Sequence, residues 1–329
     1  MGSCHPNGSL YERPLDLGRA KEQHLNFRKE LEKNGCVVVT VKEILAMDCD
    51  SDVVARVNLE DLASKCLTFK FNGSEKELLG LTEREKYLLS DEYKRECLSH
   101  MHTDQLVEVV LTNPTMHLIK QAVDTELMVT NYSFQPLVNL VFCRDQQITT
   151  CKGVVITALR SPIRAKETMV MKFCFNKLGV KVRGEIPAPG TLEGGDFFPC
   201  GKDLCMIGVG LRSNMYAVEY LLDNSLLGTR RVAIVKDYFD QSQQRMHLDT
   251  VFNIIAPKLC VVLETILGRE NRRRRLVDEY VKAEDGKYYV QRHDIEFGEF
   301  LKGEGYHMIM VSEKMQENYG LNGLNLGNG

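Results

Sequence analysis

The chain of 329 residues lacks the features that mark several classes of protein. Its formal net charge of -3 gives no broad cationic surface, so neither nucleic acid nor an anionic membrane is an expected partner. No apolar run reaches the length of a membrane span, and the first residues lack the charged-then-apolar pattern of a secretory signal. We therefore expect a cytoplasmic protein whose partner is a small molecule.

Paired cysteines are also missing. The 11 cysteines show no C-x-x-C spacing, and an odd number without a secretion signal favours reduced thiols over a disulfide framework. A structural zinc site is not expected for the same reason. With 43% hydrophobic and 26% charged residues, the chain can bury a large core in one large or two modest domains.

The first third of the chain is predicted to be mainly helical. Asp16 can cap a helix whose apolar residues recur at helical spacing as far as Leu31. A strand is expected over residues 36–41, directly after Asn34-Gly35. Residues from about 53 to 102 are charged and rich in leucine, which predicts a helical insertion, and the next strand is expected at 106–111.

The rest of the chain alternates short β-rich runs with single helices. The expected strands include residues 137–142, 154–158 and 203–209, and the expected helices include residues 165–178 and 217–222. A junction of helix, glycine and strand recurs at Gly179, Gly228 and Gly305, and also at Gly35. This recurrence predicts internal repeats that bury their faces against one another. The arginine run 272–275 is interpreted as a solvated loop or helix face.

The segment Glu193-Gly194-Gly195-Asp196 is the strongest candidate for a site. Two carboxylates flank two glycines where an apolar, strand-like run begins, so acids and backbone can both approach a small polar ligand. A plain turn explains the same pattern.

Other segments offer charged groups at the ends of predicted elements. Asp145 follows an expected strand. Alternation over residues 246–252 places His247 and Asp249 on one strand face, where they can serve as a proton shuttle. Arg164 and Arg212 lie near strand-to-helix junctions and suit a carboxylate ligand. The alternatives are that Asp145 is a turn aspartate, that His247 and Asp249 lie on a solvated strand face, and that the two arginines form surface ion pairs.

In chain order, the segments FCRD, PIRAKE, LEGGDFF, GVGLRSN and MHLDTVF resemble those of the arginine deiminases. These enzymes belong to the guanidino-group-modifying superfamily, with the amidinotransferases and agmatine deiminases. The resemblance implies an α/β propeller of five ββαβ modules, the pentein type, with an inserted helical subdomain and incomplete at both ends. The domains expected are residues 1–45 as a remnant of the first module, 46–104 as the helical insertion, and 105–329 as modules two to four with the start of the fifth.

The resemblance also implies a set of site residues. Those implied in catalysis are His247, Asp145, Glu193 and Asp249. Those implied in substrate binding are Arg164, Arg212, Asn139, Phe142 and Asp196.

The roles follow the chemistry of an arginine deiminase. Asp145 and Asp249 would grip the planar guanidinium of L-arginine, Glu193 would support the site and the histidine, and His247 would act as general acid and base. Arg164 and Arg212 would hold the α-carboxylate. The resemblance implies no metal and no organic cofactor.

The family nucleophile has no match in this sequence. In the family a cysteine thiolate attacks the guanidinium carbon, ammonia leaves, and water releases citrulline, a step of arginine catabolism. That cysteine lies well over a hundred residues beyond the His-x-Asp segment, so we expect a truncated chain that is inactive as written. The alternatives are a non-catalytic guanidino-compound-binding protein and a deiminase for another arginine-like substrate. The oligomeric state stays open, with a homodimer as the assembly considered.

Overall fold

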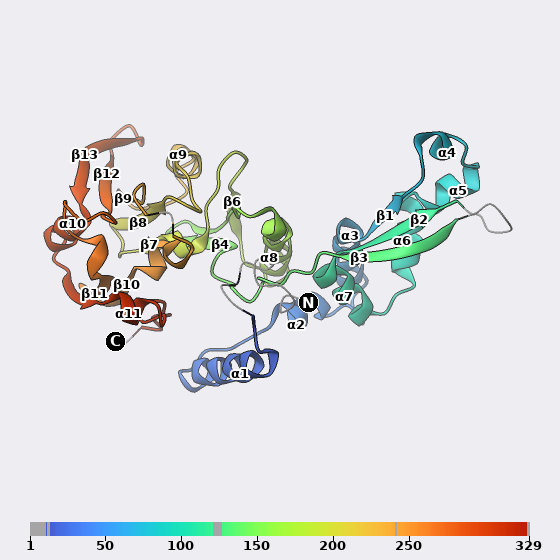
Figure 1. Ribbon diagram of the computed structural model, residues 1–329, viewed down its shortest axis with the longest axis horizontal. Coiled ribbons are helices and arrows are strands. Elements are labelled where there is room, and N and C mark those ends of the chain that lie inside the picture. The colour runs from blue at the N-terminus through green and yellow to red at the C-terminus, as the bar shows by residue number, and fades with distance from the viewer. Residues whose placement is uncertain (1–10, 12–13, 121–126, 241, 328–329) are drawn as a thin grey trace. The chain divides into compact units, whose positions relative to one another are not determined.

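The computed structural model describes residue 11 and residues 14–120, 127–240 and 242–327 (Figure 1). The chain divides into two compact units, Met1–Val141 with Met169–Leu178 and Phe142–Thr168 with Gly179–Gly329. Their sheets mix parallel and antiparallel strands and alternate with helices, so the predicted α/β class is confirmed. Within the described residues, no helix has the length and apolar character needed to cross a membrane.

The first unit combines helices with one three-stranded sheet. Its elements are α1 (Leu17–Lys33), α2 (Val41–Ala46), α3 (Val53–Cys66), β1 (Thr68–Phe71), α4 (Glu75–Leu79), α5 (Glu83–Leu88), α6 (Asp91–Ser99), α7 (Thr103–Thr112), β2 (Pro114–Ile119), β3 (Met128–Phe134) and most of α8 (Ala165–Lys177). Helix α3 packs against α6 and α7, and Val170 and Cys174 of α8 join the same apolar cluster. Asp16 caps α1, as predicted.

The second unit carries the remaining strands. They are β4 (Gln147–Thr150), β5 (Gly153–Ile156), β6 (Val182–Glu185), β7 (Phe197–Pro199), β8 (Leu204–Val209), β9 (Arg231–Lys236), β10 (Phe252–Ala256), β11 (Leu259–Leu263), β12 (Leu276–Lys282), β13 (Tyr288–Glu296) and β14 (His307–Val311). The helices after α8 are α9 (Met215–Asp223), α10 (Phe297–Gly303) and α11 (Glu313–Gln316), and the short 3-10 turns include η2 (Pro162–Arg164), η3 (Gly194–Asp196), η4 (Gln243–Arg245) and η5 (Leu248–Thr250).

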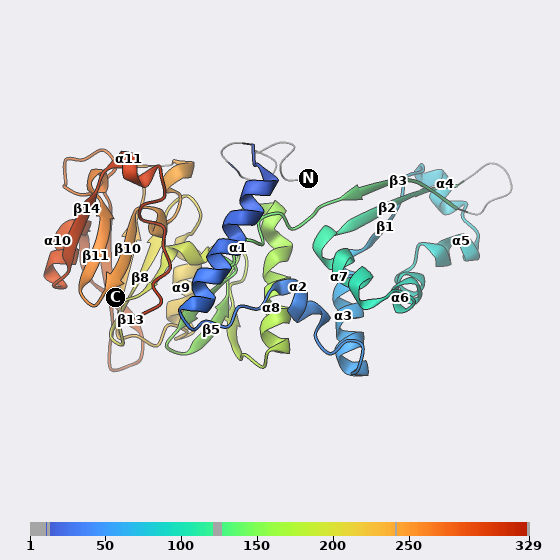
Figure 2. The same cartoon turned by 90° about the horizontal axis from the view of Figure 1, so that it is seen from below.

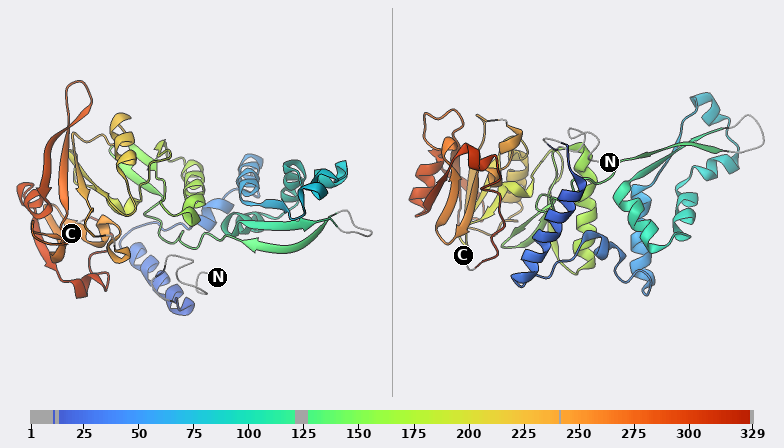
Figure 3. Two further views of the ribbon diagram at one scale, coloured as in Figure 1. Left: turned by 45° about the horizontal axis from the view of Figure 1, so that its top comes forward. Right: turned by 60° about the horizontal axis from the view of Figure 1, so that its bottom comes forward.

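One pairing pattern recurs three times along this unit. An antiparallel pair is followed by a helix and by a strand that pairs in parallel with the second strand: β4, β5 and β6, then β7, β8 and β9, then β10, β11 and β14. Figure 2 shows the last of these, with β14 beside β11. The hairpin of β12 and β13 is inserted into the third repeat and pairs with β9 of the second. Its turn extends beyond one end of β9 (Figure 3).

The glycines at the repeat junctions have the conformation that their role requires. Gly179, Gly228 and Gly305 have φ values of 70°, 78° and 77°, in the left-handed region that glycine adopts at little cost. Each precedes a strand that pairs in parallel, which confirms the predicted junction. Gly35 has φ 80° as well, but no strand follows it.

The strand predicted over residues 36–41 is therefore wrong. Residues 36–40 have no regular structure, and α2 begins at Val41 because Thr40 and Glu43 form a capping box. The T-x-x-E spacing is visible in the sequence and outweighs the β propensity of the valines before it.

Two further predicted strands are also wrong. Residues 106–111 lie within α7, whose buried face is formed by Leu106, Val107 and Val110 at helical spacing. Residues 138–141 form turns and residues 137 and 142 have no regular structure, so no strand forms there. In contrast, β5 and β8 confirm the strands expected at 154–158 and 203–209, and α8 and α9 confirm the two helices.

The predicted domain boundaries stay a prediction. The boundary after residue 45 falls within α2 and the boundary after residue 104 falls within α7, whereas the compact units divide between Val141 and Phe142.

Candidate active site

The segments that carry the candidate site residues are anchored in an apolar core. Phe198 of β7, Phe252 of β10 and Phe297 of α10 pack edge to face, with ring centroids 5.2 and 5.3 Å apart. The turn η3 directly precedes β7, and a single residue, Val251, separates η5 from β10. The same core therefore fixes the Gly-Gly turn and the His-x-Asp turn, although they lie some fifty residues apart in the chain.

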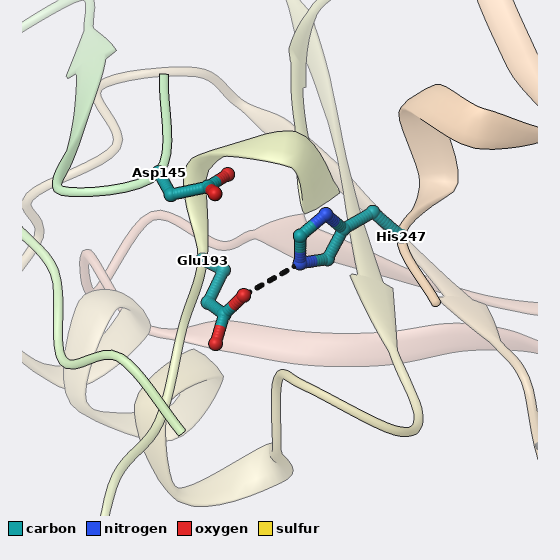
Figure 4. Close-up of side chains that lie close together, drawn as sticks. All are labelled: Asp145, Glu193 and His247. Carbon is teal, nitrogen blue, oxygen red and sulfur yellow. Dashed lines mark hydrogen bonds and ion pairs between the residues drawn. The ribbon is translucent and has the colours of Figure 1, made fainter. Parts of the chain in front are cut away.

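A histidine and a glutamate form the centre of the site. Nε2 of His247 lies 2.7 Å from Oε2 of Glu193, and both side chains are buried (Figure 4). The other oxygen of Glu193 accepts the backbone N–H of Arg160 at 3.0 Å. Ligand atoms of Asp145, Glu193 and His247 all lie within 4.8 Å of one another. Three predicted site residues thus converge.

The surrounding carboxylates keep this histidine charged. Burial alone would lower the pKa of His247, but the hydrogen bond to Glu193 and the charges of Asp196, Asp145 and Asp249 raise it above its ordinary value. Burial alone would raise the pKa of the Glu193 carboxyl. The hydrogen bond from His247 and the charge of that histidine outweigh burial and lower the pKa below its ordinary value. At neutral pH we therefore assign an imidazolium paired with a carboxylate.

The glycine pair is required because side chains fill the space that a Cβ would take. A Cβ on Gly195 would lie 2.7 Å from Nδ1 of His247 and 3.0 Å from both carboxylate oxygens of Asp249. A Cβ on Gly194 would lie 1.9 Å from the carbonyl oxygen of Arg144. The glycines thus allow the backbone of the turn to approach the reactive groups closely.

Asp196 fixes the turn that carries the histidine. One of its oxygens accepts the backbone N–H of Leu248 at 2.8 Å, and the other accepts the hydroxyl of Ser213 at 2.5 Å. Burial raises the pKa of Asp196 to about 7, although the charge of His247 and both hydrogen bonds oppose this. Asp196 contacts the backbone next to His247 and so positions it.

The predicted strand over residues 246–252 is wrong, but its two polar side chains do meet. His247 precedes the 3-10 turn η5, and β10 begins only at Phe252. Nδ1 of His247 still lies 4.0 Å from Oδ1 of Asp249, an oxygen that has no hydrogen-bond partner among the described residues. Burial raises the pKa of Asp249 to about 6, against the charges of His247 and Arg144.

Arg164 is held by carboxylates of its own chain. Its Nη1 donates to Asp145 at 2.8 Å, its Nε and Nη2 bind Glu167 at 2.9 to 3.1 Å, and Glu193 lies 3.8 Å away. Burial would lower the guanidinium pKa, but Glu167 and Asp145 raise it above the ordinary range. Gln146 donates to Glu167 at 2.7 Å and completes the cluster.

Arg212 is less completely bonded. One terminal nitrogen donates to Gln243 at 3.0 Å, while the buried Nε has no partner among the described residues. A buried donor without an acceptor is costly, so a ligand oxygen at this position would be stabilising.

The two remaining predicted residues are not placed in the cluster. Asn139 belongs to the first unit and is buried there, in the turns before Val141. Phe142 is the first residue of the second unit, and its side chain is 47% exposed.

A divalent metal ion does not suit this cluster as the side chains are arranged. The carboxylates of Asp145 and Glu193 already face the guanidinium of Arg164, and the imidazole of His247 is positively charged. A divalent ion would have to displace or neutralise these groups, so we assign none.

A second ionic network lies behind the histidine turn. Arg275 binds Asp237 at 2.9 Å, and Arg245 binds Asp240 at 2.6 Å. Arg275, Asp237 and Arg245 line, together with His247, a cavity of about 10 Å³, which has room for about one water molecule. The solvated interpretation of the arginine run is therefore wrong for Arg275, which is 2% exposed.

A protein-family model for arginine deiminase matches residues 8–329. The chain belongs to the arginine deiminase family. The arginine deiminase of Metamycoplasma arthritidis (strain 158L3-1) is 30% identical over 223 residues, which are 65% of this chain and 49% of that protein. The arginine deiminase of Staphylococcus haemolyticus (strain JCSC1435) is 26% identical over 291 residues, 85% of this chain and 67% of that protein. The chain thus spans between about half and two thirds of the length of these relatives.

Among solved structures, the product-bound N-terminal domain of ArgZ, an arginine dihydrolase from the ornithine-ammonia cycle in cyanobacteria, superposes with a TM-score of 0.43. Its sequence identity is 17%, and the match covers 65% of this chain and 63% of that chain. The predicted resemblance to the arginine deiminase family is confirmed by the family model.

Sequence reasoning missed several residues of the site in this arginine deiminase family member. Glu167 stands three positions after Arg164 within a segment that carries the resemblance, and helical i, i+3 spacing could have paired the two. Ser213 and Gln146 each follow a predicted site residue, but no periodicity points to their partners. Arg144 is adjacent to Asp145 in the chain and contacts Asp249 instead.

Proposed function

We propose that this cluster binds the guanidinium group of L-arginine. The observation that carries the proposal is a set of buried carboxylates around His247, with Oδ1 of Asp249 lacking a hydrogen-bond donor in the described part of the chain. A guanidinium is planar, always charged and presents five N–H donors, so it can satisfy several carboxylate oxygens at once. A ligand of this kind would remove the cost of the unpaired oxygen.

Each acidic group has a separate part in this proposal. Asp145 and Asp249 accept hydrogen bonds from the substrate guanidinium, and Glu193 orients His247 and keeps it charged. Because Nε2 of the histidine is engaged by Glu193, the proton available to departing ammonia is the one on Nδ1, which faces Asp249.

The α-carboxylate of the substrate is proposed to meet Arg212 and Arg164. Arg212 is the more available of the two, because its Nε is unpaired in the described structure while Arg164 is held by Asp145 and Glu167. Asn139, Phe142 and Asp196 remain proposed substrate-site residues. We assign Asp196 to positioning, since it binds the backbone beside the histidine.

The reaction proposed for the whole protein is hydrolysis of L-arginine to L-citrulline and ammonia through a cysteine thiolate. No cysteine of the described residues belongs to the cluster of Asp145, Glu193 and His247. We therefore propose that the chain by itself binds arginine without converting it. The second candidate function, a non-catalytic protein that binds guanidino compounds, rests on the same cluster of carboxylates and arginines.

The resemblance also supports a finer proposal for the fold. The three repeats each have the ββαβ order expected of a pentein module, the first with α8 as its helix and the last with an inserted hairpin. A five-module propeller is the arrangement proposed for the whole protein.

The binding proposal is tested by calorimetry with L-arginine and agmatine. We expect the wild-type chain to bind L-arginine, Asp249→Asn to bind it at least tenfold more weakly, and the exposed control Glu219→Gln to match the wild type. Agmatine, which lacks the carboxylate, should bind more weakly than arginine. Absence of arginine binding, or unchanged binding by Asp249→Asn, would contradict the proposal.

A citrulline assay on the same samples tests turnover. We expect citrulline at the level of buffer alone. Turnover well above that level would exclude the non-catalytic candidate and show that another group supplies the nucleophile.

A further inference from the structure

One acceptor of the proposed guanidinium site already faces a guanidinium of the chain itself. Nε of Arg144 lies 3.4 Å from Oδ2 of Asp249 and 3.4 Å from the carbonyl oxygen of Gly194. The guanidinium carbon lies 5.1 Å from the ring centroid of Phe198, a cation–π contact. No part of the proposed function uses this arginine.

We propose that Arg144 is an internal substitute for the substrate guanidinium, which occupies Asp249 in the empty site and is exchanged for the ligand. This inference rests on the proposed function, because exchange requires that a guanidinium ligand binds at Asp249. It makes Arg144 a residue that sets affinity and selectivity at the site.

The contact geometry suits exchange. Charge-assisted N–H···O bonds normally span about 2.7 to 2.9 Å, so a separation of 3.4 Å is loose, and a bidentate ligand can make shorter bonds to the same carboxylate. The side chain of Arg144 is 36% exposed, so its guanidinium is already partly hydrated. Moving it fully into water therefore changes its solvation little.

Arg164 provides the contrast within the same site. Its side chain is 4% exposed and binds Asp145 and Glu167 with several hydrogen bonds of 2.8 to 3.1 Å. Removing that arginine would leave Asp145 and Glu167 without their guanidinium partner. Withdrawing Arg144, in contrast, leaves Asp249 with its side-chain hydrogen bond from Asn322 and open to a ligand with the same chemistry as Arg144.

Exchange has a measurable cost in affinity. A ligand that must displace an internal competitor binds more weakly. Its apparent Kd equals the intrinsic Kd divided by the fraction of molecules in which the site is open. A partly exposed ion pair is worth up to about a fivefold change in such an equilibrium. Removing the competitor should therefore tighten binding by a factor of that order.

The test is calorimetry with ethylguanidine, which has the guanidinium group but no carboxylate and so reports on the Asp249 end alone. Arg144→Met removes the charge and keeps an apolar stem over Phe198, and Arg144→Lys keeps the charge without the planar fork. The exposed Arg272→Met is the matched control for loss of one positive charge. Thermal denaturation confirms that each variant is folded.

We expect Arg144→Met to bind ethylguanidine about fivefold more tightly than the wild type. Arg144→Lys should fall between the two, and Arg272→Met should equal the wild type. If the wild type binds and Arg144→Met binds equally or more weakly, the arginine supports the site instead of competing for it, and the inference is overturned while the proposed function stands. If no variant binds any guanidinium compound, both are overturned.

Discussion

Replacing Glu193 by glutamine should lower the pKa of His247 by at least about two units. Glutamine keeps the size and an acceptor oxygen but removes the negative charge 2.7 Å from Nε2. Burial alone would lower the histidine pKa, and in the wild type the hydrogen bond to Glu193 is the largest of the effects that oppose it.

The magnitude follows from the distance. At an effective dielectric constant of about 20, unit charges 2.7 Å apart interact by about 6 kcal/mol. One pKa unit corresponds to about 1.4 kcal/mol, so this interaction alone corresponds to roughly four units. The retained hydrogen bond and the charges of Asp145, Asp196 and Asp249 reduce the loss, which leads to the expected two units or more.

The assay is NMR titration of ring-labelled histidine in the wild type and Glu193→Gln, with the exposed Glu219→Gln as control. A pKa of His247 in Glu193→Gln within half a unit of the wild type would refute the assignment of Glu193 as its main partner. An equal shift in Glu219→Gln would refute the short-range explanation.

The free energy of unfolding should depend on pH through the same histidine. Because folding raises the pKa of His247, its contribution to stability is complete below the ordinary value of 6.5 and is lost as the pH rises through the folded value. Urea denaturation of the wild type between pH 7 and 10 should therefore show a loss of stability that is smaller in Glu193→Gln, whose histidine pKa lies closer to the ordinary value. Equal slopes for both proteins would contradict this.

Four further predictions concern the same unit. In urea denaturation, Gly195→Ala should lose about 1 to 3 kcal/mol of unfolding free energy, and it should lose most guanidinium affinity because its Cβ would overlap the site. The control Gly303→Ala has open space around its Cβ and should be neutral or stabilising. Arg212→Met should weaken L-arginine binding about tenfold or more and leave agmatine binding unchanged in calorimetry, because only arginine offers a carboxylate; an equal loss for both would contradict this role. Arginine affinity should fall as the pH drops through about 6, where Asp249 gains a proton and loses the charge that attracts a cation, and Asp249→Asn should lack this dependence. Arg275→Met should destabilise the chain by about 1 to 3 kcal/mol in urea denaturation, because the mostly buried Asp237 loses its guanidinium partner while Asp240 keeps Arg245, and a loss below about 0.5 kcal/mol would contradict that account.

Local signals along the chain predicted part of the fold and of the site. The cap at Asp16, the glycine junctions and the strands 154–158 and 203–209 depend on neighbouring residues, and they are confirmed. The family could also be predicted from the sequence, because five short segments in a fixed order carry it. Capping decided against the strand at 36–41, and a buried helical face decided against the one at 106–111.

The sequence by itself thus determined the class of fold, the family and the acidic, histidine and arginine residues that gather in the second unit. Only the tertiary structure decided which charge faces which. Arg164 is expected from the sequence to bind the substrate carboxylate, but it is bound to Asp145 and Glu167. Arg144, which the sequence does not single out, contacts Asp249. The physical reason is that an ion pair depends on distances across turns and strands far apart in the chain, and periodicity along one element carries no information about them.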